Sequence, residues 1–210
     1  MTQAPETLRE RIVDAAVAEA EGRGSWEAVR LHHVAGRLGI GLEDIRACFP
    51  EKDALIDAWF DRADRAALAA AAAPGFRELS LRERLVTVIW AWLESMAVHR
   101  RVTRQMILNK LEPGHIHIQV PALIRISRTV QWMREAAGIE HAGLRRAVEE
   151  TALTAIYLAA FGRWMLDGSP DRMETRRLLE RLVAAFVAVH APRERRGPAP
   201  SAPAGTGPAG

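Results

Sequence analysis

Acidic and basic side chains lie close together in residues 41–52, at a spacing that suits contact with a polyanion. Arg46 and Lys52 carry positive charges that can bind phosphate oxygens, whereas phosphates repel the carboxylates of Glu43 and Asp44. A carboxylate can instead accept a hydrogen bond from a cytosine amine, so one acid in such a segment can read a base. The two cations are therefore the candidate phosphate contacts, and the two adjacent acids weaken binding or select a base.

Two short helices joined by a tight turn would position these side chains. The apolar spacing predicts a helix over residues 27–38, which Ser25 can cap. Gly39 ends this helix, because glycine readily adopts the positive φ that the turn needs. A short helix over about residues 42–48 follows, and Pro50 opens the next one.

Motifs at fixed spacing extend this pattern over residues 8–65. They are RIVDAA (11–16), Gly24, VAGRLGI (34–40), Phe49-Pro50 and EKDALIDAWF (51–60). Together they resemble the helix-turn-helix domain of the TetR/AcrR family of transcriptional regulators. The resemblance implies an all-α fold of about nine helices, with an N-terminal three-helix DNA-binding module and a larger helical domain for ligand binding and dimerisation. The domains expected are residues 1–65, residues 66–191 and a disordered Pro/Ala/Gly tail at 192–210.

The resemblance also implies which residues contact operator DNA. They are Arg30, His33, Gly41, Leu42, Glu43, Asp44, Arg46 and Lys52. The chain departs from the family at Arg46, which stands where a phosphate-binding tyrosine is usual. Residues 1–65 hold nine Arg and Lys against thirteen Asp and Glu, so the basic excess of the chain lies outside this module. We therefore expect weaker DNA binding than the motif alone indicates, and whether DNA binding is retained stays open.

Helical periodicity continues through the rest of the chain, without any strand pattern or repeat. Two capping boxes, Thr7 with Glu10 and Ser80 with Glu83, mark helix starts. The EPGHIHIQVP segment at 112–121 is expected to be a linker. Beyond residue 80 we expect helices over 81–96, from about 100 to 111, over 122–137, over 142–167 and from Ser169-Pro170 onward.

Large apolar side chains recur on the longer of these helices. A ligand cavity between helices is lined by such adaptable side chains, although ordinary core packing is the alternative for each of them. The candidates are Trp59, Trp92, Met96, Met106, Trp132, Met133, Tyr157 and Trp164. A small apolar or lipid-like ligand is the expected partner of this cavity.

A second resemblance gives a rival function. The segments VQWMREAAGI (130–139) and RWMLDGSPDRMETRRLLERL (163–182) are similar to the C-terminal region of the lipid-binding accessory protein of coenzyme Q (ubiquinone) biosynthesis. That family has a TetR-like fold without DNA binding and holds isoprenoid lipids. This chain departs from it by ending in a basic stretch and a Pro/Ala/Gly tail, where that family has an amphipathic membrane helix.

Other function classes find little support. No Gly-rich phosphate loop, nucleophile elbow or zinc-ligand spacing occurs, so neither an enzyme nor a cofactor or metal is expected. The single Cys48, the charged N-terminus and the lack of any apolar run of about 18 residues fit a cytoplasmic protein without a membrane span. The apolar helices over 151–164 and 178–189 are expected to pair with a second copy, giving a homodimer.

Overall fold

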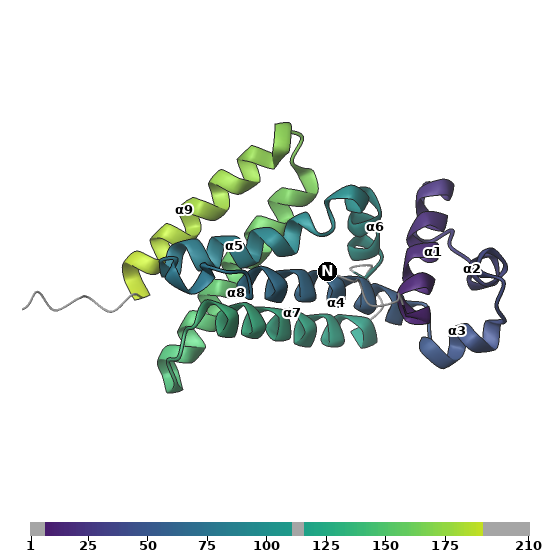
Figure 1. The fold of residues 1–210 in the computed structure, drawn as a ribbon, viewed down its shortest axis with the longest axis horizontal. Coiled ribbons are helices and arrows are strands. Elements are labelled where there is room, and N and C mark those ends of the chain that lie inside the picture. The colour runs from purple at the N-terminus through teal and green to yellow at the C-terminus, as the bar shows by residue number, and fades with distance from the viewer. Residues whose placement is uncertain (1–6, 111–115, 191–210) are drawn as a thin grey trace, which may run out of the picture.

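The computed structural model describes residues 7–110 and 116–190, and within these ranges every regular element is a helix. The prediction of an all-α fold is therefore confirmed. Figure 1 shows three short helices at one end of the molecule, a bundle of longer helices at the other, and α4 running between them. The helices of the first end and the connecting helix are α1 (Leu8–Arg23), α2 (Leu31–Leu38), α3 (Leu42–Cys48) and α4 (Asp53–Ala71).

Local capping explains where the first helices begin. The Thr7 hydroxyl accepts a hydrogen bond from the Glu10 amide at 3.2 Å, and the Glu10 carboxylate accepts one from the Thr7 amide, as predicted. In contrast, α2 begins at Leu31, four residues later than predicted, because the Ser25 hydroxyl accepts from the Glu27 amide within a turn instead of capping a helix. Gly39 ends α2 with a φ of +66°.

The long helix α4 joins the two ends of the molecule. It begins at Asp53, three residues after Pro50, and continues through residue 65, where the domain boundary was expected. Its buried face contains the apolar residues that its sequence predicts, namely Leu55, Ile56, Trp59, Phe60 and Ala63.

The larger bundle contains α5 (Leu81–Glu94), α6 (Arg100–Lys110), α7 (Ile116–Ala137), α8 (Gly143–Leu166) and α9 (Met173–His190). Three short 3₁₀ turns, Phe76–Glu78, Ala97–His99 and Pro170–Arg172, connect some of them. Helix α7 starts at residue 116 instead of 122, so part of the predicted linker is helical and the remainder, with the predicted tail from residue 192, lies outside the described residues. No helix among residues 7–110 and 116–190 has the length and apolar character to cross a membrane.

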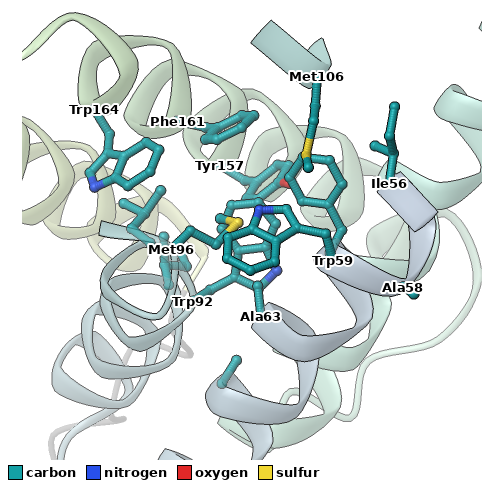
Figure 2. Close-up of a cluster of buried hydrophobic side chains, with 14 of the residues drawn as sticks. Ile56, Ala58, Trp59, Ala63, Trp92, Met96, Met106, Tyr157, Phe161 and Trp164 are labelled. Carbon is teal, nitrogen blue, oxygen red and sulfur yellow. The ribbon is translucent and has the colours of Figure 1, made fainter. Parts of the chain in front are cut away.

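Aromatic side chains form the centre of this bundle. Trp92 of α5 is 1% exposed and lies between rings from α4 and α8, with centroid distances of 5.8 Å to Phe60, 5.1 Å to Tyr157 and 5.2 Å to Phe161. Figure 2 shows Tyr157 and Phe161 reaching from their helix toward Trp92. Because offset and edge-to-face pairs add about 1 kcal/mol each to simple burial, this cluster fixes the positions of α4, α5 and α8.

The turn between α8 and α9 is built around a buried carboxylate. Asp167 is 1% exposed and accepts four hydrogen bonds of 2.6–2.8 Å, from the amide and hydroxyl groups of Ser169 and Thr175. Burial raises the pKa of Asp167, but these hydrogen bonds outweigh burial and hold the pKa below its usual range. Arg100 also donates to the Asp167 carbonyl, which joins α6 to this turn.

Candidate functional site

The seven residues of α3 present a small charged surface to solvent. Ile45 is 1% exposed and anchors α3 to the module, whereas Leu42, Glu43 and Arg46 lie on the outer face. Figure 1 shows α3 at the edge of the three-helix end, away from the bundle. The Arg46 Nε atom lies 3.2 Å from the Glu43 carboxylate, so the one base on this face is paired with an acid.

The second acid of α3 has a structural function. The Asp44 carboxylate accepts a hydrogen bond of 2.8 Å from the amide of Gly41, which is the N-cap residue. A carboxylate here also interacts favourably with the positive end of the helix dipole. Asp44 therefore stabilises the start of α3, and its presence is explained without any contact to a base.

Two residues predicted to contact DNA from α2 differ in their surroundings. Arg30 is exposed, and its guanidinium donates to the carbonyls of Glu27 and Val29 at 2.8 and 3.3 Å. His33 instead directs its Nδ1 atom into the protein, 3.1 Å from the Glu19 carboxylate. Its ring belongs to the contact between α1 and α2, while 39% of its side chain remains exposed.

Glu19 is the centre of that contact. It is 6% exposed, and it pairs with Arg23 of its own helix and with Arg37 of α2, the latter at 3.1 Å. The hydrogen bond from Arg23 lowers the pKa of Glu19, and His33 adds to this effect. These pairs hold α2 against α1, which fixes the angle at which α3 leaves the module.

Lys52, predicted to contact a DNA phosphate, makes its hydrogen bonds within the protein in this structure, and the phosphate contact stays a prediction. The Lys52 ammonium donates to the carbonyls of Trp26 and Glu27 at 2.8 and 3.2 Å, and lies 5.4 Å from the centre of the Trp26 ring. Burial lowers its pKa. Lys52 thus connects the start of α4 to the loop between α1 and α2, because the carbonyls of this loop accept hydrogen bonds from its ammonium group.

A pocket of about 240 Å³ lies in the bundle between α4, α6, α7 and α8. Two of the residues predicted to line a cavity, Trp92 and Tyr157, do line it. The others in the lining were not predicted: Asp57, Phe60, Ile107, Arg125, Ile126, Thr129, Leu158, Phe161, Gly162 and Met165. Helical periodicity predicts that such residues face the protein interior. It does not show which of the interior positions border an empty space.

The remaining predicted cavity residues fall into two groups. Five are core residues outside the pocket lining, namely Trp59, Met96, Met106, Met133 and Trp164. Trp132 does not belong to the lining of this pocket, and half of its side chain is exposed on the outside of α7. Adjacent residues on a helix point about 100° apart, so the burial of Met133 turns Trp132 outward.

One wall of the pocket is a closed network of polar groups. Asp64 of α4 accepts hydrogen bonds from the Trp92 indole at 2.8 Å, the Thr129 hydroxyl at 2.9 Å and the Arg125 guanidinium at 3.3 Å. The other terminal nitrogen of Arg125 donates to Asp61 at 2.8 Å. This network joins α4, α5 and α7.

Helix α6 connects the pocket to the three-helix end, where Figure 1 shows it beside α1. The Gln105 side chain accepts from the Trp26 amide at 2.9 Å and donates to the Gly24 carbonyl at 2.7 Å. One turn earlier, Arg101 donates to the carbonyl and carboxylate of Glu21. Since Ile107 of the same helix lines the pocket, a shift of α6 would change contacts both in the pocket and at the loop between α1 and α2.

Solved structures resemble this chain over most of its length. The TetR transcriptional regulator from Nitrosomonas europaea is 50% identical over 87% of this chain and 99% of its own, with a TM-score of 0.77. A TetR transcriptional regulator from Rhodococcus sp. RHA1 has a TM-score of 0.62 at 23% identity, covering 84% and 93% of the two chains, and supports the fold alone. No protein-family model and no curated protein matches the chain.

The helix-turn-helix of α2, Gly39 and α3, the connecting helix α4 and the bundle behind it are the arrangement that the first resemblance implied. Half of the aligned residues are shared with the Nitrosomonas europaea regulator, over nearly the whole of that protein. On this similarity of sequence and fold, the chain belongs to the TetR family of transcriptional regulators.

Proposed function

We propose that the protein binds operator DNA through α2 and α3, and that a small apolar ligand in the bundle pocket changes its affinity for that DNA. The observation that carries this proposal is the double attachment of α6, through Ile107 at the pocket and Gln105 at the loop between α1 and α2. A ligand that fits the pocket better in one position of α6 favours the matching position of α3.

A homodimer is part of this proposal. Large apolar side chains are exposed along α8, at Leu144, Val148, Leu158 and Leu166, and on α9 at Val189. Several exposed apolar side chains on one helix favour an interface there, and pairing across a two-fold axis buries the same surface of both copies. Such a dimer presents two α3 helices, and their separation is then the quantity that the ligand changes.

The rival function, an accessory protein that holds a lipid or quinone precursor, has less support. The pocket of about 240 Å³ is smaller than the roughly 300–1,000 Å³ of sites for drug-sized ligands, which leaves little room for an isoprenoid chain. The 50% identity to a transcriptional regulator also favours the regulator.

Fluorescence polarisation with the DNA upstream of the gene, at low and moderate salt, tests DNA binding directly. We expect specific binding that weakens with salt, and an Arg46→Ala variant that binds about tenfold more weakly, because it loses the one base on the exposed face of α3. Arg128→Ala, an exposed arginine on α7, is the matched control and should bind like the wild type. Failure to bind the upstream DNA even at low salt would contradict the proposal.

A further inference from the structure

We infer that the bundle pocket selects a neutral aromatic molecule of one or two rings that carries one hydrogen-bonding group. This inference names the class of ligand that the proposed regulator binds. It rests on the proposed function only for the effect of that ligand on DNA affinity. Four features of the pocket support it, namely its volume, its aromatic walls, the pairing of its charged groups and one unpaired hydroxyl.

The volume limits the size of the ligand. An engineered protein cavity of about 150 Å³ binds benzene. The pocket here is about 240 Å³, which accommodates a fused two-ring system or a single ring with a short substituent. A long acyl or isoprenoid chain exceeds this space.

The walls favour a flat ligand. Phe60, Trp92, Tyr157 and Phe161 all belong to the lining. Their rings meet edge to face or stacked, with centroids 5.1–6.2 Å apart, so they form one continuous aromatic surface from α4, α5 and α8. Aromatic ligands make the same offset and edge-to-face contacts with such a surface as these rings make with one another.

The charged groups of the lining are already paired. Arg125 is held by Asp61 and Asp64, at 2.8 and 3.3 Å, so two carboxylates already balance its positive charge. Asp57 likewise has a partner within the protein. A ligand anion would lose its hydration beside carboxylates that already balance Arg125, and a ligand cation would have to compete with Arg125 for Asp61 and Asp64, which disfavours both.

Tyr157 supplies the hydrogen-bonding group. Its side chain is 5% exposed, and its hydroxyl makes no hydrogen bond with any residue that the structure describes. Three other polar side chains of the lining, Trp92, Arg125 and Thr129, donate to Asp64. Burial raises the pKa of Tyr157, so the hydroxyl stays protonated and can donate to a ligand oxygen.

A larger side chain at position 162, now Gly162, would fill the pocket without replacing any of the side chains that line it. Gly162 lies in the interior of α8, lines the pocket, and has no atom within 4 Å of the position where a Cβ would stand. Glycine weakens a helix relative to other residues, so a longer side chain here is tolerated by the helix and extends into open space. Gly162→Leu is therefore expected to fold and to occupy ligand volume.

Isothermal titration calorimetry of the full chain without DNA tests the inference. The probes are 1-naphthol, naphthalene, 1-naphthoate, (1-naphthyl)methylammonium and 1-decanol. We expect 1-naphthol to bind most tightly, with both charged probes at least tenfold weaker. Tyr157→Phe should weaken 1-naphthol about fivefold and leave naphthalene unchanged. Gly162→Leu should abolish binding of both, while Gly162→Ala retains it.

Equal or tighter binding of either charged probe would overturn the neutral class, and tighter binding of 1-decanol would overturn the aromatic class. If no probe binds the wild-type protein, the inference fails even where DNA binding succeeds. Conversely, if the protein binds the probes but does not bind DNA, the proposed function as a regulator is contradicted and the inferred ligand class stands. Circular dichroism of Gly162→Leu separates a filled pocket from a misfolded chain, and Tyr157→Phe tests the same site if that variant misfolds.

Discussion

Glu43 and Arg46 form an ion pair across one turn of α3, with 3.2 Å between the Glu43 carboxylate and the Arg46 Nε atom. Both side chains are more than 70% exposed, and such a pair adds at most about 0.5 kcal/mol to stability. Asp44, the neighbouring acid, is engaged as the cap of α3. Asp44 keeps its negative charge in that position, so both acids oppose DNA, and DNA also has to separate Glu43 from Arg46 to reach the arginine.

Removing the charge of Glu43 is predicted to strengthen DNA binding. Glu43→Gln frees Arg46 and removes a repulsive charge, so affinity for the upstream DNA should rise about fivefold at low salt, and the salt slope should steepen by about one phosphate contact. Polarisation titrations at four salt concentrations measure both. Glu78→Gln, exposed in the first 3₁₀ turn, is the control. A loss of affinity would show instead that Glu43 accepts a hydrogen bond from a base.

Rules that act over a few residues recovered most of the fold from the sequence. The capping box at Thr7 and Glu10 and the positive φ of Gly39 depend only on neighbours in the chain, and both were predicted correctly. Lys52 could not be assigned in this way. Its partners are carbonyls of Trp26 and Glu27, about 25 positions earlier, and only the folded module brings them to the lysine.

The pocket shows a second limit of sequence reasoning. Trp92 and Met96 are four residues apart on the same face of the helix predicted over 81–96, and both are buried, yet of these two Trp92 alone lines the pocket. Whether an inward side chain meets another atom or an empty space depends on the packing of several helices. Gly162 gave no apolar signal at all, although a missing side chain inside a long helix is one sign of space that a ligand can use.

The hydrogen bonds of Gln105 are predicted to transmit the ligand signal. Gln105→Ala removes both bonds to the loop at Gly24 and Trp26. Stability should fall by about 1 kcal/mol, and the change in DNA affinity caused by 1-naphthol should fall by at least half. Calorimetric affinities for 1-naphthol with and without bound DNA give this coupling. Arg104→Ala, an exposed neighbour on α6, should leave it unchanged. The relay is refuted if Gln105→Ala retains the full coupling.

The exposed apolar side chains of α8 are predicted to form the dimer interface. Val148 is 51% exposed in the single chain, and a carboxylate placed there would be buried without a partner in a dimer through α8. Val148→Glu should therefore shift the protein to monomers, measured by sedimentation velocity at micromolar concentration. Leu108→Glu, at 57% exposed on α6, changes an equally exposed apolar residue and should remain dimeric. Dimers that survive Val148→Glu would place the interface elsewhere.

The carboxylate of Asp167 is predicted to make stability depend on acid pH. Its pKa is lowered in the folded protein, so the stabilisation is complete above the unfolded value of about 3.9 and is lost as pH falls through that value toward the folded pKa. Asp167→Asn keeps the size of the side chain but loses the charge that four hydrogen bonds stabilise. We expect a loss of about 2 kcal/mol at pH 7 that shrinks on going from pH 5 to pH 3.

Urea unfolding at fixed protein concentration, repeated from pH 7 to pH 3, measures this difference. The control is Asp171→Asn, in the same turn, where an exposed residue has a φ of +47° that asparagine adopts readily. It should leave stability nearly unchanged at each pH. A loss for Asp167→Asn that stays constant down to pH 3 would mean that the side chain acts through its shape and neutral hydrogen bonds, because only an ionised carboxylate produces the expected convergence.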